Sequence, residues 1–196
     1  MDLRSLDELL HEVQEQVPGR RILLFGSSSL FASFAGDPPS LIGVEATLDA
    51  DFFLDPDDES LRGQLSGRLG KNGAWHNSTG YYGDFVDLRL AESFPSGWRE
   101  RLVPMPGFEN VFALDPVDMA VTKIAATARS RLALRMARGG VDRGLKDINT
   151  IAALLKAGRI RRDLLTDRLQ RMDYDSALTV EASQVLAVIL KMAEGQ

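Results

Sequence analysis

The sequence predicts an α/β (α+β) fold, in which a mixed sheet with flanking helices is followed by a C-terminal helical region. Short apolar runs alternate with helical patterns in the first part of the chain, beginning with "RILLFG" at residues 21–26. Every pattern after Asp115 is helical, and the stretch 91–114, broken by prolines and glycines, separates the two parts. We therefore expect an α/β core over residues 1–113 and a helical region over residues 114–196 packed on it.

The predicted elements of the first part alternate in type. Leucine and valine recur at helical spacing over residues 3–17, which predicts a packing helix that "VPG" ends. The apolar run before Gly26 is typical of a short strand covered on both faces, and the serines after it begin a helix that Gly36 ends. The later patterns predict an extended stretch at 41–56, a helix at about 59–70, a strand at 81–90, and helices at about 116–138, 146–157, 162–172 and 176–193.

The composition is that of an ordinary globular protein, with 44% apolar and 26% charged residues. The absence of cysteine excludes disulfides and thiolate zinc sites and is compatible with a reducing compartment. The N-terminal segment is charged and amphipathic, unlike a signal peptide, and no apolar run approaches the roughly 18 residues of a membrane span. We therefore expect a soluble, cytoplasmic protein with no membrane partner.

Charge is distributed unevenly along the chain. Residues 1–119 carry 9 Lys+Arg against 20 Asp+Glu, a net charge of −11, whereas residues 120–196 carry 14 against 8, a net charge of +6. An acidic part that could collect divalent cations thus precedes a basic part that could meet phosphates. The alternative is that surface charge varies between helices without functional reason.

Two aspartates interrupt the second extended stretch, in "TLDADFF". Side chains two residues apart in a strand share a face, so Asp49 and Asp51 should project together. Two neighbouring carboxylates repel each other unless a cation or water lies between them. Magnesium binds through one or two carboxylates together with nucleotide phosphates, which predicts a magnesium site here, although a D-x-D pair at a strand end can also be merely solvated.

A third carboxylate lies in the expected strand at 81–90, where Asp87 occupies a central position. On a strand next to the D-x-D pair, Asp87 would be a third metal ligand or the base that takes a proton from an attacking hydroxyl.

The turn after the first strand is rich in small residues, with Gly26 followed by Ser27 and Ser28. Glycine allows close backbone approach and the serines add hydroxyl donors, so the turn could receive a phosphate. The alternative is that a serine caps the following helix. The spacing is neither that of a P-loop nor that of a dinucleotide-binding fingerprint.

The order of these motifs resembles the nucleotidyltransferase superfamily, whose pattern is Gly-Ser, then D-x-D, then one more acid. The matching residues are Gly26, Ser27, Asp49, Asp51 and Asp87. The later part looks like the AbiEii-type, toxin-related branch, through "LDPVDMAVTKIAA" with Lys123 and "LKDINTIAALL" with Lys146 and Asp147. The resemblance covers roughly residues 20–157 and departs from the family in the longer gap between Gly26 and Asp49.

The resemblance implies a nucleotidyltransferase-like mixed sheet and transfer of a nucleotidyl group from a nucleoside triphosphate to a hydroxyl acceptor, which is RNA, protein or a small molecule. Asp49, Asp51 and Asp87 would bind Mg²⁺, with Mn²⁺ as the alternative metal, and Asp87 would activate the nucleophile. Gly26, Ser27, Ser28, Lys123, Lys146 and Asp147 would contact the nucleotide. The branch also implies a toxin with an antitoxin protein as its partner.

Some alternatives remain open from the sequence. Lys123 could be a helix-surface lysine, and Asp147 a first-turn acid beside a solvated Lys146. At the level of function, the alternatives are a noncatalytic domain that binds a nucleotide or a protein, and a D-x-D glycosyltransferase, for which 196 residues are few. His76 could orient a base or an acceptor, or be structural.

Overall fold

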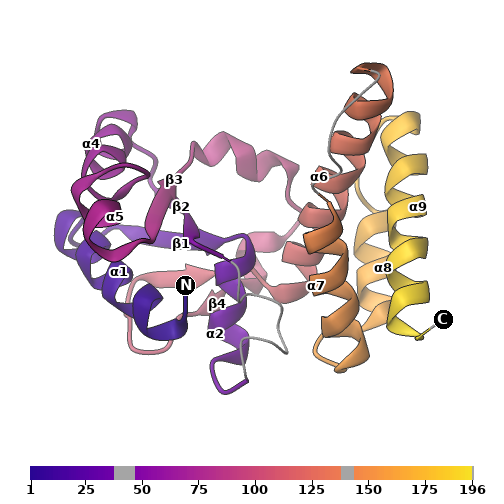
Figure 1. Ribbon diagram of the computed structural model, residues 1–196, viewed down its shortest axis with the longest axis horizontal. Coiled ribbons are helices and arrows are strands. Elements are labelled where there is room, and N and C mark those ends of the chain that lie inside the picture. Colours follow the sequence, from indigo (N-terminus) through magenta and orange to yellow (C-terminus); the bar gives the residue numbers. More distant parts are fainter. Residues whose placement is uncertain (38–46, 138–143, 196) are drawn as a thin grey trace. The chain divides into compact units, whose positions relative to one another are not determined.

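A computed structural model describes residues 1–37, 47–137 and 144–195, and it has an α/β fold with a five-stranded mixed sheet and additional C-terminal helices (Figure 1). The predicted α/β class is confirmed. Residues 41–46 of the expected second extended stretch lie outside the described residues, as does the predicted end of the helix at 138.

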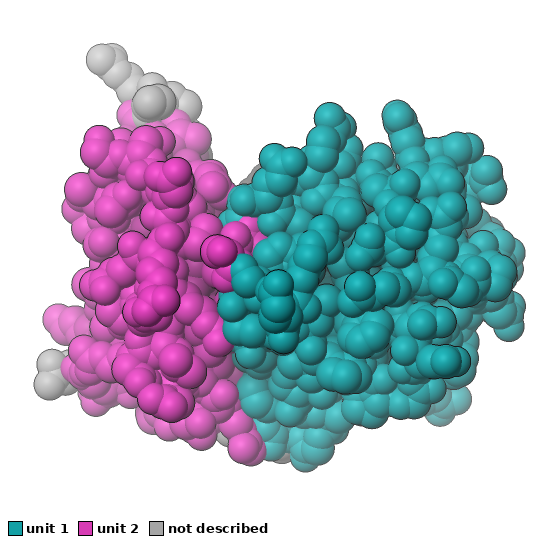
Figure 2. Space-filling view, turned by 180° about the vertical axis from the view of Figure 1, so that it is seen from behind, with its two compact units in different colours: residues 1–40, 44–93, 97–116 teal, residues 41–43, 94–96, 117–196 magenta. Residues whose placement is uncertain are grey.

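The chain divides into two compact units, which Figure 2 shows in different colours. Unit 1 comprises residues 1–40, 44–93 and 97–116 and contains the sheet. Unit 2 comprises residues 41–43, 94–96 and 117–196 and contains the C-terminal helices. The main division therefore falls after Pro116, three residues beyond the boundary expected from the sequence.

The sheet of unit 1 has the strand order β3-β2-β1-β5-β4. The central strand β1 runs antiparallel to β2 and parallel to β5, while β2 is parallel to β3, and β4 is antiparallel to β5. The strands are β1 (Arg21–Phe25), β2 (Asp49–Asp55), β3 (Tyr82–Phe85), β4 (Val103–Pro104) and β5 (Val111–Ala113).

Strand β1 lies at the centre of the sheet because its side chains can be buried on both faces. Ile22, Leu23 and Leu24 are at most 2% exposed, although consecutive side chains in a strand point to opposite faces. The continuous apolar run therefore predicted a doubly covered strand correctly.

The N-terminal helix α1 (Leu3–Gln16) begins where the Asp2 carboxylate accepts a hydrogen bond from the Ser5 N–H at 2.8 Å. Its buried face consists of Leu6, Leu9, Leu10 and Val13, at the helical spacing that predicted it. The described residues of unit 1 also form the helices α2 (Leu30–Phe34), α4 (Glu59–Leu69) and α5 (Ala74–Thr79), with 3₁₀ segments at Ser27–Ser29, Leu88–Ser93 and Trp98–Arg101.

The strand expected at residues 81–90 is shorter than predicted, because β3 ends at Phe85 and a 3₁₀ segment begins at Leu88. The Asp87 carboxylate accepts a hydrogen bond from the Arg89 backbone N–H at 2.8 Å. This local bond stabilises a turn that is incompatible with an extended chain. Asp87 is therefore not central to a strand, and the sequence prediction was wrong on this point.

Unit 2 is helical, as predicted, with α6 (Pro116–Ala137), α7 (Leu145–Lys156), α8 (Arg162–Gln170) and α9 (Ser176–Ala193). Within it, the fully buried Asp118 accepts a hydrogen bond from Arg168 at 2.9 Å. Helix α9 is long and apolar enough to cross a membrane. Core helices of soluble proteins can have the same length and composition.

Candidate functional site

Gly26 and Asp51 lie in direct contact at the end of β1. Gly26 has φ +67° and ψ −158°, a conformation that is essentially restricted to glycine. A Cβ atom added to Gly26 would lie 2.1 Å from Asp51 Oδ2, so a side chain there would displace the carboxylate or the turn. The turn after β1 therefore faces the D-x-D strand despite the long stretch of chain between them, which the sequence left open.

The three serines after Gly26 differ in their hydrogen bonds. Ser28 donates to the Phe25 carbonyl at 3.3 Å, and Ser29 donates to the Gly26 carbonyl at 2.7 Å, so both hydroxyls stabilise the turn. Ser27 is only 7% exposed, and its hydroxyl has no hydrogen-bond partner among the described residues. Ser27 is thus the serine whose hydroxyl remains available to a ligand, whereas Ser28 has a structural role in the turn.

The register of β2 and β3 brings a set of polar side chains to one face of the sheet. Asp49 is paired with Tyr82, and Asp51 with Asp84, and paired residues of neighbouring strands share a face. Burial raises the pKa of Tyr82 above its usual 10.0, and the negative charges of Asp49, Asp84 and Asp51 raise it further. The three carboxylates therefore lie close enough to Tyr82 to act on it electrostatically.

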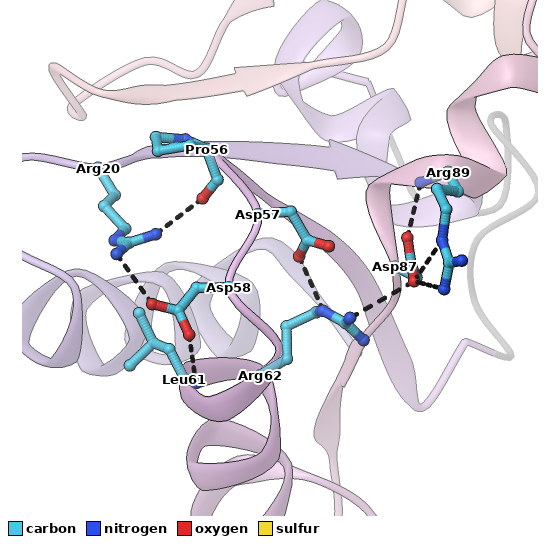
Figure 3. A network of polar contacts seen from close by, with 8 residues as sticks. All are labelled: Arg20, Pro56, Asp57, Asp58, Leu61, Arg62, Asp87 and Arg89. Atoms are coloured by element: carbon cyan, nitrogen blue, oxygen red, sulfur yellow. Dashed lines mark hydrogen bonds and ion pairs between the residues drawn. The ribbon is translucent and has the colours of Figure 1, made fainter.

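Asp87 instead belongs to a network of ion pairs (Figure 3). Its carboxylate accepts a hydrogen bond from Arg89 Nε at 2.9 Å and lies 3.5 Å from Arg62, which is itself 2.8 Å from Asp57. Together with Trp98 and neighbouring residues, Asp57, Asp87 and Arg89 line an open cavity of about 390 Å³. The structure therefore brings Asp49 and Asp51 together with Asp84, and it places Asp87 between two arginines.

The ion pairs of Asp87 lead to a testable prediction about the pKa of its carboxyl group. Hydrogen bonds from the Arg89 side chain and backbone lower the pKa of Asp87 from 3.8 to about 2. Because the folded-state pKa is lowered, the pair stabilises the fold above pH 3.8 and this contribution is lost as the pH falls toward 2. We expect ¹³C NMR of the carboxyl carbon to show this low pKa and Arg89→Ala to raise it.

Arg62→Ala is the matched control for this titration, because Arg62 contributes less to the lowered pKa than Arg89 does. It should raise the pKa of Asp87 by a smaller amount. A wild-type carboxyl that titrates at its ordinary value would contradict the network.

The predicted nucleotide contacts of the later part lie in unit 2. Lys123 Nζ donates a hydrogen bond to Asp147 Oδ1 at 2.6 Å, and both side chains are largely buried, at 16% and 24% exposure. Lys123 is therefore not a solvated surface lysine, and Asp147 is more than a first-turn acid. Lys146 is exposed at the start of α7.

The carboxylates of Asp49 and Asp51 fit a magnesium ion that a bound ligand would also coordinate. Among the residues that the structure describes, no group of three or more His, Cys, Asp or Glu side chains is arranged to hold a metal ion. Magnesium commonly uses one or two carboxylates and completes its coordination with water and phosphate oxygens. Asp49 and Asp51, partly exposed and on one strand face, meet that requirement.

Sequence reasoning missed Asp84 and Tyr82. The signal that could have identified them is the two-residue spacing of "YGD", which equals the spacing of "DAD", so that the two motifs align when the strands pair in register. The choice of Asp87 depended on a strand that extends to Leu90, and the structure ends that strand at Phe85.

No family model, curated protein or solved structure matches the chain. The resemblance to nucleotidyltransferases therefore depends on the motifs and their order alone.

Proposed function

We propose that this chain is a magnesium-dependent nucleotidyltransferase with a nucleotidyltransferase-like fold. It would move a nucleotidyl group from a nucleoside triphosphate to a hydroxyl acceptor on RNA, protein or a small molecule. The contact between Gly26 and the Asp51 carboxylate carries the proposal, since it joins the glycine-serine turn to the D-x-D strand. A turn with phosphate-binding character beside two carboxylates is the arrangement that a metal-bound triphosphate requires.

Each part of the site has a role in this proposal. Asp49 and Asp51 would hold Mg²⁺, with Mn²⁺ as the alternative, and the bound ion would neutralise and orient the triphosphate. Gly26 leaves room for the Asp51 carboxylate to approach the turn, and the Ser27 hydroxyl would donate a hydrogen bond to a phosphate oxygen. The resemblance separately implies a phosphate contact for Lys123, whose ammonium group Asp147 holds within unit 2.

The carboxylate that takes the proton of the acceptor hydroxyl is proposed to be Asp84 rather than Asp87. Asp84 is in register with Asp51 and is exposed, so an acceptor can reach it. Asp87 is held by Arg62 and Arg89, and its low pKa makes it a weak proton acceptor. We also propose Lys146 as a nucleotide contact. The proposed biological setting is a toxin with an antitoxin protein as its partner.

The test is transfer from each of the four labelled triphosphates, with magnesium and with RNA or protein as acceptor. We expect Asp49→Ala to reduce transfer by roughly 100-fold or more, because removal of a group that stabilises transition-state charge has effects of that order. Release of pyrophosphate and labelling of the acceptor are both measured.

Asp55→Asn is the matched control, because Asp55 lies on the same strand and is paired with Arg21 and Arg99. It should leave transfer nearly unchanged. Asp84→Asn should reduce transfer more than Asp87→Asn, and the opposite ranking would return the base to Asp87. Equal activity of Asp49→Ala and the wild type would refute the proposed site.

A second candidate is a noncatalytic domain that binds a nucleotide or a protein. The pairing of Asp87 with two arginines favours it, because Asp87, the third acid of the motif pattern, is then not poised for chemistry and Asp84 alone would have to act as the base. A thermal shift with a triphosphate and magnesium, without turnover across a broad set of acceptors, would support this second candidate.

A further inference from the structure

Tyr82 carries a phenolic hydroxyl on the same sheet face as the proposed metal ligands. It is paired with Asp49 across β2 and β3, and Asp84 follows two residues later on the same face. Burial raises the pKa of its hydroxyl, and so do the charges of Asp49, Asp84 and Asp51 and a hydrogen bond to Asp49. A hydroxyl is the kind of group that the proposed reaction modifies.

The ring of Tyr82 has a defined neighbour in His76 of α5. The two rings meet edge to face with centroids 5.0 Å apart. His76 is itself fixed, because its Nδ1 accepts a hydrogen bond from the Asn72 backbone N–H at 3.0 Å. His76 therefore packs against a hydroxyl-bearing residue of the site.

Ser27 lies beside these carboxylates, directly after Gly26. It is more than nine-tenths buried, and its hydroxyl lacks a hydrogen-bond partner within the described part of the chain. Among the described residues, the buried side-chain polar atoms without a partner belong to Trp75 and Tyr174, so the Ser27 oxygen reaches solvent and could donate to a phosphate oxygen beside Gly26 and Asp51.

We propose that Tyr82 is a site of self-nucleotidylation, an inference that rests on the proposed function. Tyr82 Oη attacks the α-phosphorus of a bound nucleoside triphosphate, an O–P bond forms, and the bond from that phosphorus to the β-phosphate oxygen breaks. Pyrophosphate leaves, and the phenolic proton passes to the Asp84 carboxylate and then to water. The product carries a nucleoside monophosphate on Tyr82, which fills the acceptor position and blocks further transfer.

The experiment incubates the full chain with magnesium and each of the four triphosphates, without added acceptor. Intact-mass spectrometry should show the addition of one nucleoside monophosphate, and peptide mapping should place it on Tyr82. Tyr82→Phe should lose the modification while retaining the ring and its packing against His76, which a thermal unfolding curve checks. Peptide mapping of the wild-type protein locates the modified residue directly, so the test does not depend on whether the variant folds.

Tyr81→Phe is the matched control, since Tyr81 is the adjacent tyrosine and its hydroxyl donates to Glu8 at 2.8 Å, away from the carboxylate face. It should remain fully modified. Pyrophosphate release or labelling of an added acceptor with Tyr82 unmodified, or modification at another residue, would overturn this inference and leave the proposed function standing. Absence of any turnover would overturn both.

Discussion

Gly26→Ala is expected to abolish nucleotidyl transfer and to lower the free energy of unfolding of unit 1 by about 1–3 kcal/mol. The native backbone at Gly26, with φ +67°, is strained for any residue with a side chain, and the added methyl group would overlap Asp51 Oδ2 at 2.1 Å. Relief of that overlap must move the Asp51 carboxylate or the turn. Urea denaturation followed by tryptophan fluorescence, together with the transfer assay, measures both effects.

Gly63→Ala is the control for this substitution. Gly63 is an exposed residue of α4 with nothing within 4 Å of an added Cβ, and alanine is the better helix former by about 0.5–1 kcal/mol. The control should therefore stabilise the protein slightly and leave transfer unchanged. If Gly26→Ala were as stable and as active as the wild type, the close approach of the turn to Asp51 would not exist in solution.

Arg168→Ala is expected to lower the free energy of unfolding of unit 2 by about 3 kcal/mol. Asp118 is fully buried, and Arg168, at 17% side-chain exposure, donates a hydrogen bond to it at 2.9 Å. Removal of the guanidinium leaves a buried carboxylate without this partner, and the desolvation of a charge is expensive. Urea denaturation followed by far-ultraviolet circular dichroism measures the loss of helix.

The matched control is Arg171→Ala, because Arg171 follows α8 and pairs with Asp167 in the open, at 77% and 47% exposure. Exposed pairs of this kind contribute about 0–1 kcal/mol, so the control should barely shift the transition. Replacement of both Asp118 and Arg168 by apolar residues should recover much of the lost stability. If Arg168→Ala lowered the free energy of unfolding no more than Arg171→Ala does, the ion pair of Asp118 and Arg168 would not be buried in solution.

The sequence predicted those features that depend on local patterns. The apolar run of β1, the alternation that sets Asp49 and Asp51 on one face, and the helical spacing of α1 are each visible within about fifteen residues. The short strands β4 and β5 lie in the stretch 91–114 that separates the two predicted parts.

The features that sequence reasoning missed depend on pairing across distant segments. Whether the Gly26 turn meets Asp51 is decided by the antiparallel register of β1 and β2, in which Phe25 lies opposite Asp51. The choice between Asp84 and Asp87 is likewise decided by the register of β2 with β3. A local sequence pattern does not determine the register of two strands, because the register follows from which strands pair and where each strand ends.

The pairing of Lys123 with Asp147 illustrates the same limit in unit 2. The sequence suggested a nucleotide contact for each residue, with a helix-surface lysine and a first-turn acid as the alternatives. The packing of α6 and α7 brings them within 2.6 Å, so each residue determines the environment of the other.

The position of β1 in the sheet has a consequence for synthesis on the ribosome. One edge of β1 pairs with β2, but its other edge pairs with β5, where Ile22 meets Val111. A nascent chain must therefore emerge almost to the end of unit 1 before its central strand gains a second neighbour. Until then one edge of an apolar strand is open to pairing with other chains, which favours aggregation at this stage of translation.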